Sequence, residues 1–176
     1  MRALRTRDGA PIGEVFRFLS GLYFRGKLAY ASHFVRPPSP SWVGSGVLVI
    51  SANRGLLPAE TRVCLEHLEA FAETDIHASE RTFRAPFVRD AELLRAELDD
   101  ASDVVLLGSV AQAKYTAPLL EVFDDRVLFP ETFVGRGDMS RGGLLLRAVA
   151  AKQELIYAKI KGATLHGPRP SKLKRR

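Results

Sequence analysis

The sequence predicts an α/β fold in which a central, mostly parallel sheet lies between two helical layers, a three-layer α/β/α arrangement. Short apolar runs rich in β-branched residues at 47–51, 104–108 and 127–130 have the composition of buried strands. Apolar residues recur at helical spacing in the segments that follow these runs, so strands alternate with helices after residue 46. Such alternation is typical of parallel sheets that are covered by helices on both faces.

Length and charge predict one domain over residues 1–160 and a basic, disordered tail over residues 161–176. The chain has 176 residues, and 46% of them are hydrophobic, which suits a domain with a substantial core. Six of the 26 basic residues and none of the 20 acidic residues lie in the tail, so the remainder is formally neutral. The tail is expected either to attract phosphate backbones or only to keep the chain soluble.

Several classes of protein are not indicated. No apolar run approaches the roughly 18 residues that span a bilayer, and no signal-peptide core follows the N-terminus. These observations predict a soluble, cytoplasmic protein without a membrane partner. The single cysteine, Cys64, has no partner for an internal disulfide, and the four histidines are scattered, so we expect neither a metal site nor a cofactor. The oligomeric state does not follow from the sequence.

The first helix is expected over residues 13–35, and it is unusually rich in aromatic side chains. Gly21 and Gly26 weaken the helical pattern or mark a break in it. Aromatic residues such as Tyr23 and Tyr30 are expected in the core, although stacking on nucleic-acid bases is the alternative. The Pro-rich segment 36–41 ends the helix as a loop.

Later elements follow from the same patterns. Pro86 argues against a central strand, and Pro118 predicts a kinked or opened helix. The expected elements are a helix at 58–72, a short edge strand at 82–87, helices at 90–99 and 111–123, a loop at 131–137, and a long final helix at 140–160.

Polar residues follow the first predicted strand directly, and they form the first candidate site. Asn53, Arg54 and Gly55 come where open α/β sheets place their ligand crevice, at the carboxyl end of a strand. The carboxamide of Asn53 can orient a water molecule or read a base edge, and Arg54 can contact phosphate. The alternative is structural, because asparagine also tolerates left-handed turn geometry and Arg54 can simply be exposed.

The loop after the third strand is the richest candidate for phosphate binding. Glycines let backbone N–H groups approach an anion at a helix start, and arginines bind phosphate through a planar fork. The alternative is a capped turn with two solvated arginines. The residues predicted to bind phosphate or nucleic acid here and at the end of the second strand are Ser109, Arg136, Gly137, Ser140, Arg141, Gly142 and Gly143.

Three segments carry a resemblance to a known family. The chain resembles a group of bacterial domains of unknown function in three segments. These are residues 19–31, which contain Leu-Tyr and Ala-Tyr-Ala, residues 48–58, which contain Ser-Ala-x-x-Gly-Leu-Leu-Pro, and residues 104–108. That group is similar in layout to the uracil-DNA glycosylase superfamily. The resemblance implies a glycosylase-like α/β fold, and it places Asn53 at the residue that orients the hydrolytic water. Arg54 stands where the mismatch-glycosylase branch has proline, and 137–141 stand where it has His-Pro-Ser.

Residues and resemblance together predict a nucleic-acid- or nucleotide-binding domain. If the domain is catalytic, we expect a divergent hydrolase of base N-glycosidic bonds that uses Asn53, although the sequence does not decide whether it is an enzyme. The alternative from another class is a non-catalytic interaction protein whose basic tail docks on an acidic partner. In that case the same loops are purely structural.

Overall fold

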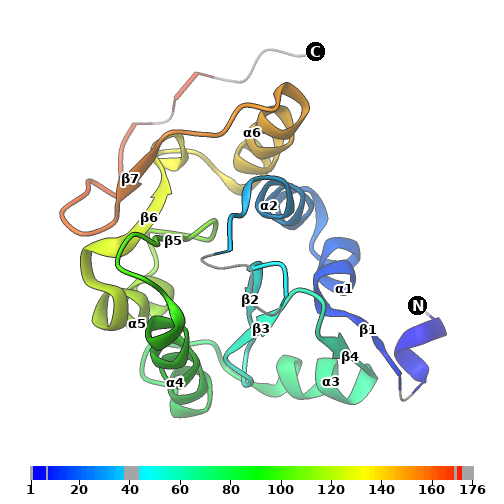
Figure 1. Cartoon of the computed structure of the whole chain (residues 1–176). Coiled ribbons are helices and arrows are strands. Elements are labelled where there is room, and N and C mark those ends of the chain that lie inside the picture. The colour runs from blue at the N-terminus through cyan, green and yellow to red at the C-terminus, as the bar shows by residue number, and fades with distance from the viewer. Residues whose placement is uncertain (1, 7, 38–43, 169, 172–176) are drawn as a thin grey trace.

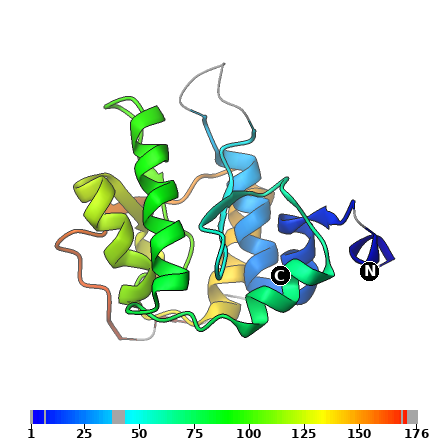
Figure 2. The same ribbon diagram turned by 90° about the horizontal axis from the view of Figure 1, so that it is seen from below.

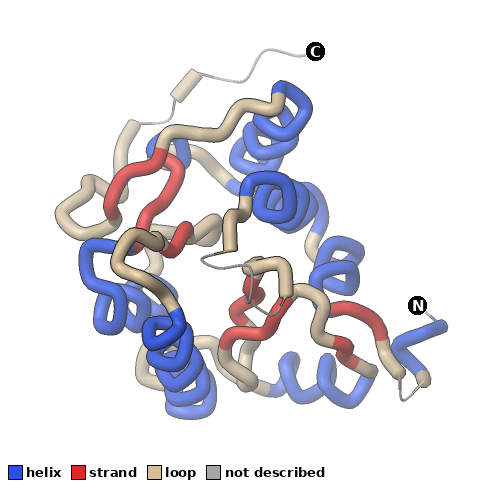
Figure 3. The backbone as a smooth tube through the Cα atoms, viewed as in Figure 1, coloured by secondary structure: helices blue, strands red, loops and turns tan. Residues whose placement is uncertain are grey.

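A computed structural model describes residues 2–6, 8–37, 44–168 and 170–171, and it has a mixed α/β fold, which confirms the predicted class (Figure 1). Among these residues the strands lie in three small, separate sheets (Figure 3). The pairs are β1 (Ala10–Pro11) with β4 (Arg62–Val63), β2 (Leu48–Ile50) with β3 (Leu56–Pro58), and the three-stranded sheet of β5 (Val104–Val105), β6 (Val127–Pro130) and β7 (Tyr157–Lys159).

The central parallel sheet that the sequence predicted is not present in the described residues. Strand β2 pairs antiparallel with β3, with Val49 opposite Leu57. Gly55, at φ +68°, turns the chain back after β2, so that Leu56–Pro58 joins the preceding strand instead of starting a crossover helix. Among the described residues, the only parallel strand pair is β5 with β6, and β7 pairs with β6 in antiparallel orientation.

The aromatic N-terminal helix is two helices. Helix α1 (Ile12–Leu19) is followed after Ser20 by α2 (Gly21–Phe34). The two are separate helices because Gly21 takes a φ of +67°, a left-handed conformation that residues with side chains disfavour. Gly26 marks no break; it lies inside α2 at a crossing with another helix. The loop predicted at 36–41 is described only at Arg36 and Pro37, and its other residues lie outside the described part of the chain.

The middle of the chain differs from the predicted order. Residues 58–63 lie in β3, a turn and β4, so the helix expected from Pro58 begins only at α3 (Leu65–Glu73). The edge strand expected at 82–87 is wrong, because these residues form the first turns of α4 (Arg81–Glu97). Phe83, Phe87 and Ala91 are buried at a spacing of four residues along α4. That helical spacing outweighs the strand-like composition and Pro86.

The last predicted helix is also shorter than expected. Helix α6 (Asp138–Ala151) ends where Lys152 adopts a left-handed conformation, at φ 51°, and Gln153 N–H bonds to the Ala148 carbonyl. The chain then returns as β7, and Ile156, which the predicted helix at 140–160 includes, is exposed just before this strand. The remaining helical elements are α5 (Ala113–Phe123) and the short 3₁₀ helices η1 (Arg2–Arg5), η2 (Asp124–Arg126) and η3 (Glu131–Phe133).

Two hydrophobic clusters hold these elements together. The larger joins α2, α4, α5, α6 and the three-stranded sheet, and the smaller joins α1, α3 and both two-stranded sheets. Aromatic side chains dominate the larger cluster, as the core interpretation predicted, and Tyr30 is only 1% exposed. Figure 2 shows α2 and α6 side by side through the middle of the molecule.

The start of the predicted tail packs against the larger cluster. Ala163 and Leu165 are partly buried there, and an added Cβ on Gly167 would lie 2.9 Å from Val134. The basic residues Arg169, Lys172, Lys174, Arg175 and Arg176 lie outside the described residues. In the described part of the chain, no helix combines the length and apolarity needed to cross a membrane.

Candidate functional site

A tight turn between β2 and β3, residues 51–55, carries the first group of predicted site residues. Buried Ser51 closes it twice: its N–H donates to the Gly55 carbonyl at 2.8 Å, and its hydroxyl donates to the same oxygen at 3.0 Å. The Ser51 oxygen also accepts from the Arg54 backbone N–H at 3.0 Å. The turn is therefore held by its own hydrogen bonds, and the backbone of Arg54 is fixed while its side chain is exposed.

Helix α4 clamps this turn from one side. An added Cβ on Gly55 would overlap Asp90 Oδ2 and the Pro86 carbonyl oxygen, so glycine alone permits the approach. The same Asp90 Oδ2 accepts a hydrogen bond from the Leu56 N–H at 3.0 Å. The left-handed conformation of Gly55 and its close packing both require glycine, and its predicted contact with phosphate stays a prediction.

Asn53 ties the turn to the end of α3. Its Nδ2 donates to the Ala70 carbonyl at 2.9 Å and to Thr74 Oγ1 at 3.0 Å, while Thr74 Oγ1 itself donates to Ala70 at 2.8 Å. Both amide hydrogens are therefore engaged. Asn53 Oδ1 has no hydrogen-bond partner among the described residues, and it is not among the fully buried unpaired atoms there. The oxygen is left as an accessible acceptor.

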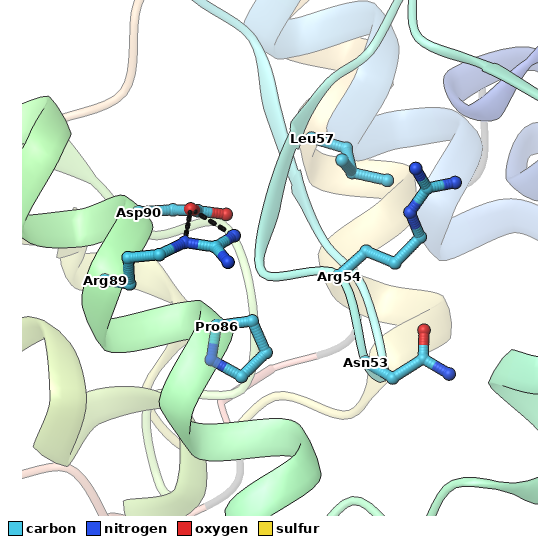
Figure 4. Close-up of a pocket in the computed structure, with 6 residues that line it drawn as sticks. All are labelled: Asn53, Arg54, Leu57, Pro86, Arg89 and Asp90. Atoms are coloured by element: carbon cyan, nitrogen blue, oxygen red, sulfur yellow. Dashed lines mark hydrogen bonds and ion pairs between the residues drawn. The ribbon is translucent and has the colours of Figure 1, made fainter.

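A cleft of about 360 Å³ lies between the turn and α4 (Figure 4). This volume is at the lower end of the range for small-molecule sites. Arg54 and Arg89 bring two guanidinium groups to it, and Asp90 brings one carboxylate, so its net charge is positive. Its lining residues are Asn53, Arg54, Leu57, Pro86, Arg89 and Asp90.

The two arginines of the cleft differ in their partners. Arg89 Nε donates to Asp90 Oδ1 at 2.7 Å, and its Nη2 lies 2.6 Å from the same oxygen. The side chain of Arg54 has no ion pair or hydrogen bond in the part of the chain that the structure describes. Figure 4 shows Arg89 turned onto Asp90, and Arg54 extending away from both toward Leu57. Arg54 is therefore the cation available to an anionic ligand.

The other predicted site residues lie elsewhere, at the carboxyl ends of β5 and β6. Tyr23 of α2 joins these ends: its hydroxyl donates to the Leu107 carbonyl at 2.8 Å and lies 3.2 Å from that of Gly108. Its ring meets Phe133 edge-on, with centroids 6.3 Å apart. Burial raises the pKa of Tyr23 from 10.0 to about 12. Ser109 follows directly and accepts a backbone hydrogen bond from Gln112 at 3.4 Å.

The arginines of the third loop bind the loop itself. Arg141 is only 8% exposed, and its Nε and Nη2 donate to the Phe133 carbonyl at 3.2 and 3.1 Å. Arg136 donates from Nε to the Thr132 carbonyl at 3.0 Å and from Nη1 to Ser140 Oγ at 3.3 Å. The alternative interpretation expected two solvated arginines in a capped turn, whereas Arg141 is buried and the N-cap of α6 makes no side-chain hydrogen bond. Their predicted contact with phosphate stays a prediction.

The glycines of this loop have separate structural roles. Gly142 lies in the second turn of α6, not the first, and its added Cβ would come 2.8 Å from the Leu22 carbonyl oxygen. In return, an added Cβ on Gly26 would lie 2.7 Å from the Gly142 carbonyl oxygen. Two glycines therefore allow α2 and α6 to cross closely. Gly137, the N-cap of α6, faces open space, and Gly143 follows Gly142 inside the helix.

Sequence reasoning missed Lys27, which lies beside this second group. Its Nζ sits over the rings of Tyr23 and Phe24, 4.7 and 5.0 Å from their centroids. Burial lowers the pKa of Lys27, and the Asp138 carboxylate partly offsets this effect. The spacing of three and four residues from two aromatics on one helix was the available signal.

The predicted residues thus fall into two groups that contact different elements. Asn53 bonds to α3 and Gly55 packs against α4, whereas Gly142 packs against α2 and Arg141 bonds to η3. None of residues 136–143 lines the cleft beside α4, so the two groups do not share it. No group of side chains there has the composition of a metal site.

No protein-family model matches the chain, and neither the curated proteins nor the solved structures contain a match to it.

Proposed function

We propose that the chain binds a phosphate-bearing ligand, a nucleotide or a nucleic-acid strand, in the cleft between the β2–β3 turn and α4. The observation that carries the proposal is Arg54: an exposed guanidinium without a described partner, on a backbone that Ser51 holds in place. A rigid support reduces the entropy lost when a ligand binds. Guanidinium groups bind phosphate through paired, charge-assisted hydrogen bonds.

The remaining lining residues suit the rest of a nucleotide. Leu57 and Pro86 offer apolar surface to a flat base, and Asn53 Oδ1 offers a hydrogen-bond acceptor. Arg89 adds a second positive charge, although Asp90 already holds it.

Hydrolysis of a base N-glycosidic bond is the catalytic form of this proposal. In that form Asn53 Oδ1 accepts a hydrogen bond from the attacking water, which is the role that the resemblance to uracil-DNA glycosylases implies. Binding does not depend on the resemblance. The two are separated by measuring base release from oligonucleotides under conditions in which the same oligonucleotides bind.

The proposal is tested by calorimetric titration of mononucleotides and short oligonucleotides. Arg54→Ala should weaken binding by about 1.5–3 kcal/mol, the usual contribution of a hydrogen bond to a charged group. Arg25→Ala is the matched control, since Arg25 is exposed on α2 and lines no part of the cleft. Equal loss in both variants, or none in Arg54→Ala, would contradict a site at this cleft.

The basic C-terminus should contribute non-specific affinity for nucleic acid. Removal of residues 172–176 leaves Ala163 and Leu165 packed on the core and takes away four cations. For duplex DNA each neutralised phosphate contributes a slope of about −0.9 to log affinity against log salt. The truncated chain should therefore bind with a shallower salt dependence. An unchanged slope would exclude a contribution from these residues.

A further inference from the structure

The amide of Asn53 has a defined orientation, and this limits what the cleft can recognise. Ala70 O and Thr74 Oγ1 are acceptors toward Asn53, because the Thr74 hydroxyl hydrogen is already directed to Ala70. A flipped amide would place Oδ1 against both oxygens and lose two hydrogen bonds. Nδ2 therefore faces α3, and Oδ1 is the polar atom that Asn53 leaves to a ligand.

The neighbouring backbone donors are also occupied. The Arg54 N–H donates to Ser51 Oγ, and the Leu56 N–H donates to Asp90 Oδ2. Apart from the guanidinium groups, the polar atoms of Asn53 and Asp90 at the cleft are oxygens that accept hydrogen bonds. A base edge placed against this wall meets acceptors, so it gains by presenting donors.

We propose that the cleft prefers nucleotides whose base presents an exocyclic amino group, as cytosine and adenine do, over bases with a carbonyl at that position. The inference rests on the proposed function, because it assumes that the phosphate binds at Arg54. The amino groups of cytosine and adenine are donors, whereas the equivalent thymine and uracil oxygen is an acceptor. A carbonyl facing Asn53 Oδ1 leaves both oxygens unpaired and opposed, which a polar site rejects strongly.

The test compares two ligand pairs that differ by amino against carbonyl. Cytidine and uridine monophosphate form one pair, and adenosine and inosine monophosphate form the other. The amino member of each pair should bind about tenfold more tightly, in line with one base-edge hydrogen bond. Binding of all four with equal affinity would overturn the inference and leave the proposed function standing. No binding of any of them would overturn both.

Two variants locate the preference at Asn53. Thr74→Val removes an acceptor that orients the amide but lies outside the cleft lining, so it should reduce the preference at least threefold while phosphate affinity persists. Asn53→Ala should abolish the preference. Thr132→Val, at an exposed threonine, is the control and should retain it. A full preference in folded Thr74→Val protein would overturn the role given to the fixed amide.

Discussion

The β2–β3 turn and the start of α6 carry similar sequences, since each places arginine and glycine after a buried strand, but they use them differently. At the turn, the backbone groups form hydrogen bonds with Ser51 and Asp90, and the Arg54 side chain has no hydrogen-bond partner among the described residues. At α6, the Arg141 guanidinium is buried and donates two hydrogen bonds to the Phe133 carbonyl. The same residue types therefore supply an available cation in one region and a structural brace in the other.

The difference follows from what packs opposite each glycine. Gly55 admits a carboxylate side chain from α4, and that carboxylate satisfies the neighbouring backbone. Gly142 admits the backbone of α2, which closes the space that a ligand would need. Gly55 and Gly142 thus both mark close approaches, and the approaching element decides whether the region is open or filled.

The largest expected effect is at Gly55. Gly55→Ala combines left-handed strain of about 1–2 kcal/mol with overpacking of about 1–3 kcal/mol, because Cβ overlaps Asp90 and Pro86. The free energy of unfolding, measured in urea, should fall by their sum. Gly137→Ala is the control, since its Cβ meets nothing within 4 Å. Equal stability of the two variants would mean that α4 does not clamp the turn.

Gly142→Ala should have the next largest effect. Its Cβ meets main-chain atoms of Leu22 and Tyr23 at 2.8 Å, and a backbone cannot move aside as a side chain can. Overpacking of about 3 kcal/mol should exceed the gain of about 1 kcal/mol that alanine brings to a helix interior. If urea unfolding shows this variant to be as stable as the parent, α2 and α6 are not closely packed and the loop is open to a ligand.

Arg141→Ala tests whether the second region is a brace. Removal takes the two charged donors from the buried Phe133 carbonyl and leaves it only the Arg136 backbone N–H, so the free energy of unfolding should fall by about 1.5–3 kcal/mol, the usual contribution of a hydrogen bond to a charged group. Arg136→Ala should destabilise less, because its side chain is only half-buried. If both variants keep the parent's stability and instead lose affinity for nucleotides, the start of α6 is a ligand site and not a structural brace.

The smallest expected effect is at Tyr23, and it depends on pH. Tyr23→Phe loses the hydrogen bond to Leu107 and should be less stable at pH 8 by about 1 kcal/mol. The folded protein favours the neutral phenol, since burial raises its pKa from 10.0 to about 12. Between these values the unfolded chain releases the proton first, so the parent loses stability as pH rises.

The difference in stability between parent and Tyr23→Phe should therefore shrink above pH 10. Unfolding in urea at pH 8, 10 and 11 measures it. Tyr30, Tyr115 and Tyr157 also have raised pKa values, but they are present in both proteins and cancel in the difference. A difference that stays constant from pH 8 to pH 11 would place Tyr23 in a solvated environment.

Local pattern predicted some of the elements that need only an apolar face. Strand 127–130 and the helix ending at Phe123 appear nearly as expected. Residues 58–63 and 157–159 were assigned to helices, yet both pair with strands that precede them in the chain. Strand pairing depends on a partner outside the segment itself, so helical spacing within one segment does not exclude it.

For the candidate site, the sequence determined which residues carry charge, which positions are free to adopt left-handed geometry, and that Asn53, Arg54 and Gly55 form one unit. Only the tertiary structure decided which of these groups remain available to a ligand. Hydrogen-bonding capacity is a property of each residue, whereas its use depends on what the fold brings against it. Asn53 keeps an oxygen free because α3 takes its nitrogen, whereas Arg141 is buried with its Nε and Nη2 bonded to the Phe133 carbonyl and its Nη1 3.7 Å from Asp138.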